Sequence, residues 1–266
     1  MDGLDAAPVP SSQNQLELLK TSGRRFHTPS DDALPRLTDV EAAEAFIDTD
    51  DVAVIGFFEG EESYGYKEFL EAVKEVKPIP VALCSDKEVW ANYNIATDTI
   101  SIFRKADVAQ ENLQLSDAKK VDADGLIRYM KMNNVRYITE YNQVTATGLF
   151  QSRVKTHVLL FANRGSADYS KLQKRLGALA PDFSGKFLFV LVNGAVKTNE
   201  RSLGYFGLKM RDLPRVGLYD SDLDQKWLMP KGAITKDAVR AFCQSFLDGE
   251  LQKTQEAGEP EAKTEL

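Results

Sequence analysis

The chain has two cysteines, Cys84 and Cys243, whose spacing determines whether it could catalyse disulfide exchange. They lie far apart in the sequence, and the chain has no Cys-x-x-Cys motif. Disulfide exchange needs two thiols close enough to join, with one held as a low-pKa thiolate. Cys84 ends an apolar run, and Cys243 lies beside Phe242 and Phe246 on the inner face of a predicted helix. Because free cysteine is among the most buried residue types, we predict two core cysteines and no enzymatic activity. A thiol-dependent enzyme is an alternative that requires one exposed cysteine with a lowered pKa.

Histidine gives little scope for metal or hydrolytic chemistry, since the chain has only His27 and His157. This number excludes a site with several histidine ligands and argues against a Ser-His-Asp triad. We predict a structural role for His157, at the head of a strand, and we predict no metal and no cofactor.

Composition limits the classes of partner. The chain has 266 residues, of which 43% are apolar and 27% charged, with a net charge of −7. This charge argues against a nucleic-acid surface, which needs a clustered basic face. The longest apolar runs, such as residues 187–192, fall short of the roughly 20 residues that span a bilayer, so no membrane segment is predicted. An acidic calcium-binding protein is an alternative, although 33 basic side chains dilute the acidic ones.

The elements that would position any site alternate between helix and strand in the first half of the chain. Asp39 or Thr38 can cap a helix that carries Val40 and Ile47, and Pro78 and Pro80 interrupt a later one. A continuous apolar run over residues 52–58 predicts a strand buried on both faces of a sheet. After it we predict helices at 66–76, 87–93 and 123–133 and strands at 81–84 and 99–103.

The second half repeats this order, which predicts an α/β protein made of two similar units in tandem. We expect residues 138–140 to begin this unit, strands at 157–161, 187–192 and 215–219, and helices at 169–180, 200–206 and 235–247. We therefore predict a flexible leader at 1–36, domains at 37–136 and 137–249, and a disordered acidic tail at 250–266 after a helix that Gly249 ends.

Several motifs in order give these units a resemblance. The segments 155–161 (Lys-Thr-His-Val-Leu-Leu-Phe), 183–189, 205–208 (Tyr-Phe-Gly-Leu) and Leu213-Pro214 closely resemble the non-catalytic b′ domain of protein disulfide isomerases. The first half resembles the b domain of that family through residues 94–95, 99–104 and 137–142. The resemblance implies two thioredoxin-like domains, each a central mixed β-sheet flanked by helices.

A thioredoxin fold carries its active dithiol directly after the central strand. At that place this chain has Glu59-Gly60-Glu61-Glu62 in the first half and Asn163-Arg164-Gly165-Ser166 in the second, neither with sulfur. We predict solvated turns there and no catalytic residue. The fold also places a cis proline beside its ligand groove, which predicts a cis bond at Leu213-Pro214, whereas the first half has Asp98-Thr99 at the corresponding position.

In the family that it resembles, the b′ domain binds unfolded polypeptide in an apolar pocket. Carried over residue by residue, the resemblance implies a peptide-binding site formed by Tyr141, Ala146, Phe150, Leu203, Tyr205 and Phe206. Ser202 stands where the family has a larger aliphatic residue. The alternative is that Phe150 and Phe206 are only core residues.

The resemblance also implies a partner, the redox-active isomerase called endoplasmic reticulum protein fifty-seven, bound through an acidic motif that contains Trp. The corresponding residues here are Asp222, Asp224 and Trp227, with Lys226 in place of an acidic neighbour. Near the C-terminus, Lys263, Thr264, Glu265 and Leu266 resemble a signal that a retrieval receptor reads in the endoplasmic reticulum lumen. The predicted function is a non-catalytic lumenal chaperone and adaptor that holds unfolded chains and recruits an isomerase.

Overall fold

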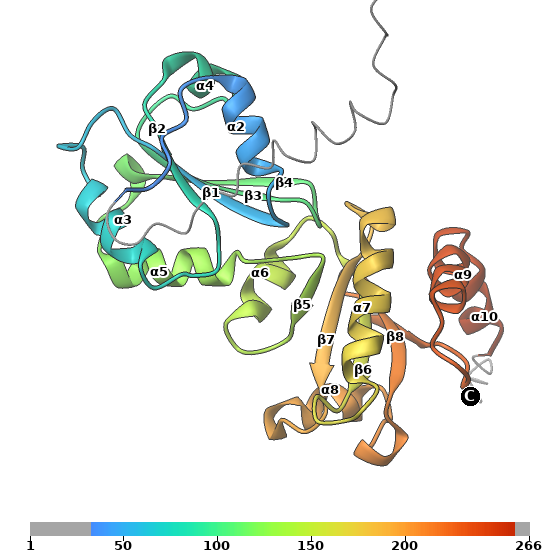
Figure 1. Cartoon of the computed structure of the whole chain (residues 1–266). Coiled ribbons are helices and arrows are strands. Elements are labelled where there is room, and N and C mark those ends of the chain that lie inside the picture. Colours follow the sequence, from blue (N-terminus) through green and yellow to red (C-terminus); the bar gives the residue numbers. More distant parts are fainter. Residues whose placement is uncertain (1–32, 259–266) are drawn as a thin grey trace, which may run out of the picture. The chain divides into compact units, whose positions relative to one another are not determined.

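The computed structural model describes residues 33–258, and these contain two separate β-sheets (Figure 1). The first sheet has four strands in the order β2-β1-β3-β4, and the second has five in the order β5-β7-β6-β8-β9. Residues 1–32, with most of the predicted leader and His27, and residues 259–266, with the predicted retention signal, lie outside the described range.

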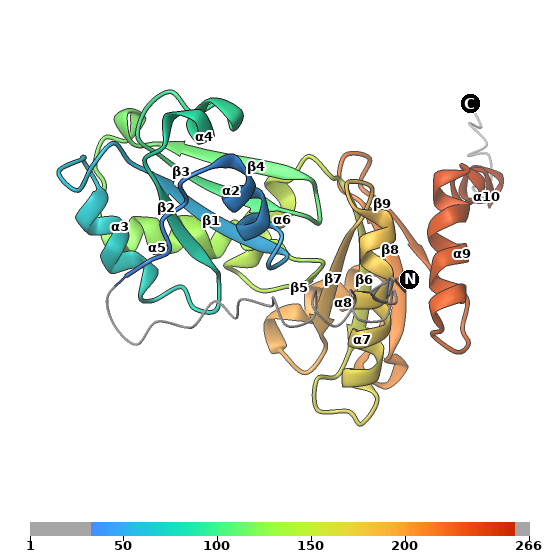
Figure 2. The same ribbon diagram turned by 45° about the horizontal axis from the view of Figure 1, so that its top comes forward.

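The first sheet is built around β1, whose residues are all buried. β1 pairs parallel with β2 and antiparallel with β3, so the sheet is mixed. Helices α2 and α4 pack on one face, where Phe46 and Trp90 join a common cluster, and α3 and α5 lie side by side (Figure 2). The elements are α2 (Val40–Ile47), β1 (Val52–Phe57), α3 (Tyr66–Val73), β2 (Val81–Cys84), α4 (Lys87–Asn92), β3 (Thr99–Arg104), β4 (Ala109–Gln114), η1 (Leu115–Asp117) and α5 (Ala123–Met132).

The second sheet is also mixed, because β6 pairs parallel with β7 and antiparallel with β8. The predicted α/β class, two units with mixed sheets flanked by helices, is confirmed. The division between residues 136 and 137 stays a prediction. The elements are β5 (Ile138–Glu140), α6 (Thr145–Gln151), β6 (Thr156–Ala162), α7 (Tyr169–Leu179), η2 (Ala180–Phe183), β7 (Leu188–Asn193), η3 (Lys197–Asn199), α8 (Glu200–Tyr205), η4 (Met210–Asp212), β8 (Arg215–Asp220), β9 (Gln225–Leu228), α9 (Lys236–Leu247) and α10 (Glu250–Gly258).

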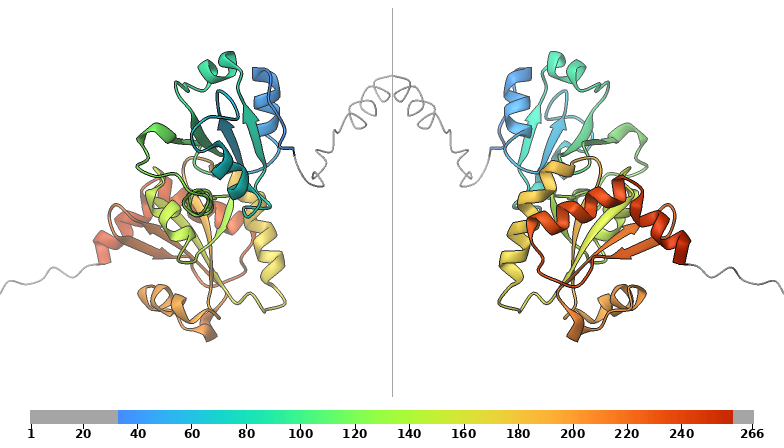
Figure 3. Two further views of the ribbon diagram at one scale, coloured as in Figure 1. Left: turned by 90° about the vertical axis from the view of Figure 1, so that its left-hand side faces the viewer. Right: turned by 90° about the vertical axis from the view of Figure 1, so that its right-hand side faces the viewer.

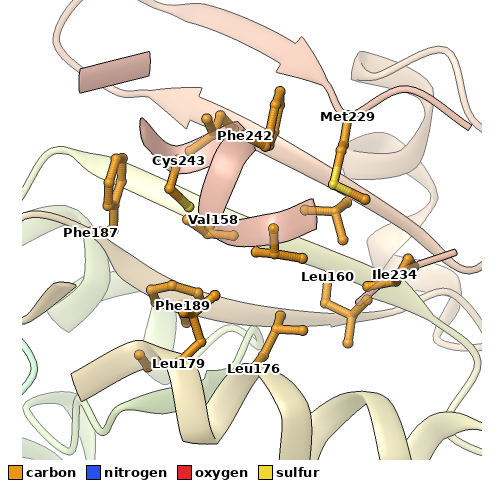
Figure 4. Close-up of a cluster of buried hydrophobic side chains, with 14 of the residues drawn as sticks. Val158, Leu160, Leu176, Leu179, Phe187, Phe189, Met229, Ile234, Phe242 and Cys243 are labelled. Atoms are coloured by element: carbon orange, nitrogen blue, oxygen red, sulfur yellow. The ribbon is translucent and has the colours of Figure 1, made fainter. Parts of the chain in front are cut away.

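Strand β6 divides its side chains between two faces of the second sheet, since successive residues of a strand point in opposite directions. Val158 and Leu160 pack against α7 and α9, and Cys243 lies in the same cluster (Figure 4). In the right-hand view of Figure 3, the red α9 lies in front of this sheet. Leu159 and Phe161 point to the other face, where they pack with residues of α6 and α8. That second face carries the candidate site.

Two details of the backbone compare directly with the sequence predictions. The Leu213–Pro214 peptide bond is cis, as predicted, and Lys77–Pro78 is a second cis bond that was not predicted. Gly249 has a φ of 73° directly after α9, which is the left-handed conformation expected of a glycine that ends a helix. Among the helices between residues 33 and 258, none combines the length and the apolar character needed to cross a bilayer.

The predicted disorder of the tail is wrong for residues 250–258, which form α10. Leu251, the one large apolar residue of this helix, packs against the core cluster of the second half. Its carbonyl oxygen also accepts a hydrogen bond of 3.2 Å from the indole nitrogen of Trp227. The sequence did not predict this helix because the segment is mainly polar. A single apolar contact and one backbone hydrogen bond leave almost no pattern in the sequence.

Candidate functional site

An open cavity of about 260 Å³ lies on the face of the second sheet that α6 and α8 flank. Alternate residues of β6 and β7 form its floor, because each contributes every second side chain to this face. The residues that line it are Tyr141, Leu149, Phe150, His157, Leu159, Val190, Val192, Arg201, Ser202, Tyr205, Phe206, Tyr219 and Asp224. Most of them are aromatic or aliphatic, so the cavity suits an apolar group better than a charged one.

Four of the six predicted peptide-binding residues line this cavity: Tyr141, Phe150, Tyr205 and Phe206. Phe150 is 44% exposed and Tyr205 39% exposed, whereas Phe206 is 7% exposed and packs on the ring of Phe161 at 4.9 Å. The core alternative is therefore correct for Phe206, which is both core and wall, and wrong for Phe150.

The other two predicted residues do not reach the cavity. Leu203 is buried beneath it, in the cluster that supports its floor. Ala146 is half-buried on α6 and does not line the cavity. Leu203 lies two positions before Tyr205 on α8, about 200° around the helix, so its side chain faces away from the residues that line the cavity. Ala146 shares a face of α6 with Leu149 and Phe150, and its short side chain does not reach the cavity.

Sequence reasoning missed several lining residues, among them His157 and Tyr219. These two residues are direct partners across β6 and β8, and their rings lie 6.3 Å apart between centroids. The sequence did contain one indication, because side chains along β6 alternate between the two faces of the sheet. One face receives His157, Leu159 and Phe161, and the other receives Val158 and Leu160. Without the pairing of β8, the sequence did not show which phase faces a ligand cavity and which faces the core.

His157 is an unusual feature of this apolar site because it is only 3% exposed. Burial lowers the pKa of its ring from 6.5 to about 4, although the backbone carbonyls of Val154 and Leu149 act in the opposite direction. Within the described part of the chain, its Nε2 atom has no hydrogen-bond partner. At neutral pH the ring is therefore uncharged, and the cavity floor stays free of positive charge.

Asp224 fixes the tyrosines at the rim of the cavity. Its Oδ1 atom accepts hydrogen bonds from the hydroxyls of Tyr205 at 2.8 Å and Tyr219 at 3.1 Å. Burial, with help from the Asp224 hydrogen bond and charge, raises the pKa of Tyr205 to about 12. The Nζ atom of Lys226 lies 3.8 Å from the centroid of the Tyr205 ring. These contacts hold the turn between β8 and β9 against the rim.

The predicted partner-binding residues do not form one surface. Trp227 is 9% exposed and packs against Phe246 in the core on the opposite face of the sheet, so its assignment to partner binding is wrong. The reason is that Gln225–Leu228 form strand β9, in which Trp227 points to one face and Leu228 to the other. Asp222 is exposed on the turn, and Asp224 faces the cavity.

Both cysteines are buried, in different clusters of the two halves. Burial raises the pKa of Cys84 and raises that of Cys243 to about 12. A reactive cysteine requires the opposite shift, so these environments contradict the thiol-enzyme alternative.

The turns that stand in place of a dithiol are exposed at Glu59 and Arg164. Each of these residues forms an exposed ion pair, with Lys87 at 2.8 Å and Glu140 at 3.0 Å respectively. Between residues 33 and 258, no group of three or more His, Cys, Asp or Glu side chains is placed to hold a metal ion.

Several known proteins are similar to this chain. A family model described as a thioredoxin-like domain matches residues 58–245. Endoplasmic reticulum resident protein 27 of Bos taurus is 40% identical over 233 residues, which cover 87% of this chain and 85% of that protein. Protein disulfide-isomerase of Gallus gallus is 33% identical over 221 residues, 83% of this chain but 42% of that protein. Among solved structures, the bb fragment of ERp72 is similar with a TM-score of 0.42 at 15% identity. The match covers 82% of this chain and 97% of the ERp72 fragment.

Proposed function

Because the chain belongs to the thioredoxin-like protein disulfide isomerase family, in the group of endoplasmic reticulum resident protein 27, we propose that it is a non-enzymatic binding protein for unfolded polypeptides. It resides in the endoplasmic reticulum lumen, the location predicted from the sequence. The observation that supports the binding function is the open, mainly apolar cavity of the second half, with exposed aromatic side chains at its rim.

The cavity has the properties that promiscuous binding of apolar segments requires. Aromatic side chains offer a large contact area, and each apolar side chain that they cover contributes roughly 1.5–3 kcal/mol. A volume of about 260 Å³ accommodates one large side chain rather than a folded domain. The site would therefore bind single apolar residues of extended chains, weakly and with little dependence on sequence.

Replacement of Phe150 by alanine tests this function most directly, because the side chain is 44% exposed and lines the cavity. We expect about a tenfold weaker affinity for a fluorescein-labelled peptide rich in leucine and phenylalanine, since loss of about 1.4 kcal/mol of apolar contact corresponds to that factor. Fluorescence anisotropy gives the affinity.

The matched control is Leu247→Ala, which removes a side chain of similar exposure, 41%, from the end of α9. This variant should bind like the wild type. Equal affinity of the Phe150→Ala variant and the wild type, or no binding by the wild type, would exclude the proposed site. Phe206 is a poorer choice for this test because its substitution would also disturb the core.

We further propose that the protein recruits a redox-active disulfide isomerase of the endoplasmic reticulum, endoplasmic reticulum protein fifty-seven, to the chains that it holds. The turn between β8 and β9 supports this through Asp222, an exposed carboxylate, and Leu223, which is 63% exposed. The charge of Lys226 opposes a basic partner less than the sequence suggested, because its ammonium group lies over the Tyr205 ring. Retrieval by a receptor that reads residues 263–266 completes the proposal.

Charge reversal at Asp222 tests recruitment. We expect Asp222→Lys to weaken binding of the isomerase about tenfold or more, since juxtaposed like charges at an interface oppose binding. Surface plasmon resonance with the immobilised isomerase measures this. Asp248→Lys, on the exposed end of α9, is the control with the same change of net charge. If both variants bind the isomerase equally, the turn is not the recruiting surface.

A further inference from the structure

The turn between β3 and β4, residues 105–108, belongs to the first half but contacts the second half. Ala106 is buried in the cluster that supports the floor of the cavity. Its carbonyl oxygen accepts a hydrogen bond of 2.8 Å from the backbone nitrogen of Gly185. Arg153 donates a hydrogen bond to the carbonyl oxygen of Val108 at the other end of the turn. The turn therefore meets the second half at two residues, Ala106 and Val108, which flank Asp107.

Asp107 is the charged centre of this contact, and its side chain is completely buried. Both of its carboxylate oxygens accept hydrogen bonds from Arg104, at 3.0 Å from Nε and 2.7 Å from Nη2. The guanidinium also contacts Glu111 and the side-chain oxygen of Asn133, both at 3.0 Å. A bidentate pair with these further partners holds the carboxylate in one orientation.

One carboxylate oxygen of Asp107 reaches across to the second half. The hydroxyl of Ser152, the C-cap residue directly after α6, donates a hydrogen bond of 2.7 Å to Oδ2. The same hydroxyl accepts a hydrogen bond of 3.1 Å from the backbone nitrogen of Val154. Ser152 is 1% exposed. If the Asp107 carboxylate were removed, water could therefore not replace it as the acceptor for the Ser152 hydroxyl.

Helix α6 is held against the first half at a second point. A Cβ atom on Gly148 would lie 1.9 Å from the carbonyl oxygen of Met132, the last residue of α5, so only glycine permits this approach. Between this contact and Ser152 lie Leu149 and Phe150, which both line the cavity. The wall of the cavity is therefore anchored on both sides by the first half.

We propose that Asp107 is a positioning residue for the binding cavity. Through Ser152 its carboxylate fixes the C-terminal end of α6, and the fixed helix keeps Leu149 and Phe150 at the cavity. The first half thus acts as a part of the site although it supplies no lining residue. The inference rests on the proposed function, and it deepens it by naming what determines the shape of the site.

The variant Ser152→Ala tests the proposal, because it removes the hydrogen bond between Ser152 and Asp107 and leaves the Arg104–Asp107 pair intact. The matched control is Ser101→Ala: that hydroxyl is also buried and also donates a hydrogen bond of 2.7 Å, to Asn112 within the first sheet. Hydrogen exchange of the α6 amides and the affinity for the labelled leucine- and phenylalanine-rich peptide are measured for both variants.

We expect α6 amides in Ser152→Ala to exchange about tenfold faster, since a hydrogen bond to a charged group contributes about that factor. The apparent peptide affinity is reduced by the fraction of molecules in which Leu149 and Phe150 stay at the cavity, and we expect this reduction to be about twofold. Ser101→Ala should change neither quantity.

Unchanged α6 exchange in Ser152→Ala would overturn the proposal, and so would faster exchange with wild-type peptide affinity. If the wild type binds no peptide, the proposed function fails by itself. In that case the exchange of the Leu149 and Phe150 amides still decides whether Asp107 positions this wall.

Discussion

Replacement of Asp107 by alanine should lower the free energy of unfolding by about 3–5 kcal/mol, because it leaves a buried guanidinium without its main counter-charge. The side chain of Arg104 is 1% exposed and that of Asp107 is not exposed at all. Glu111 is the remaining carboxylate at 3.0 Å, but its side chain is 45% exposed and therefore screened by water. Urea unfolding followed by circular dichroism measures the loss.

The exposed pair of Asp182 and Arg240 provides the control. Its N–O distance of 2.6 Å is close to the 2.7 Å of the Arg104–Asp107 pair, but its side chains are 46% and 44% exposed. We expect Asp182→Ala to lose much less stability than Asp107→Ala, because water already solvates both charges. Similar losses in the two variants would mean that burial of the Asp107 pair is not what makes it important.

A double variant distinguishes the effect of the unpaired buried charge from the effect of the lost hydrogen bond to Ser152. Arg104→Met combined with Asp107→Leu removes both buried charges, and it should be more stable than Asp107→Ala alone, since apolar side chains often replace a buried ion pair with little loss. If the double variant is as unstable as the single one, the hydrogen bond to Ser152 accounts for most of the effect.

The sequence predicted the fold well where one residue class repeats along a buried element. The apolar run Val52–Phe57 forms the central strand of the first sheet, and residues 156–162 form that of the second. Strand β4, Ala109–Gln114, was not predicted because it is an edge strand of mainly polar residues. Its pairing with β3 supplies the order that its composition does not show.

The candidate site was only partly predictable for a related reason. The resemblance identified aromatic residues such as Tyr141, Phe150 and Tyr205 that do line the cavity. It assigned Trp227 to the surface, because β9 was not predicted and the alternation along it was therefore unknown. The contact of Asp107 with Ser152 joins residues 45 positions apart, so no local pattern could reveal it.

The stability of the protein should fall as the pH decreases from about 6.5 to 4, and His157 should account for up to roughly 3 kcal/mol of the fall. Burial lowers the pKa of its ring to about 4 in the folded state, against 6.5 for an ordinary histidine. Below pH 6.5 the unfolded chain therefore binds a proton that the folded chain excludes, and unfolding becomes more favourable. The stabilising contribution is complete above pH 6.5 and is lost progressively towards pH 4.

His157→Phe isolates this contribution, because phenylalanine keeps an aromatic ring beside Phe150 and Tyr219 but does not titrate. Urea unfolding near pH 7 and near pH 5 gives the change in stability for each protein. We expect the wild type to lose about 2 kcal/mol more than the variant between these two pH values. All other titratable groups are the same in the two proteins, so their contribution cancels in the difference.

An equal loss in the two proteins would mean that His157 titrates in the folded state much as it does in the unfolded chain. Its ring would then be charged near pH 5, and the floor of the cavity would carry a positive charge there. An uncharged floor is what an apolar ligand requires, since burial of an unpaired charge beside it is strongly unfavourable. The pH dependence of unfolding therefore tests the polarity of the cavity without any ligand.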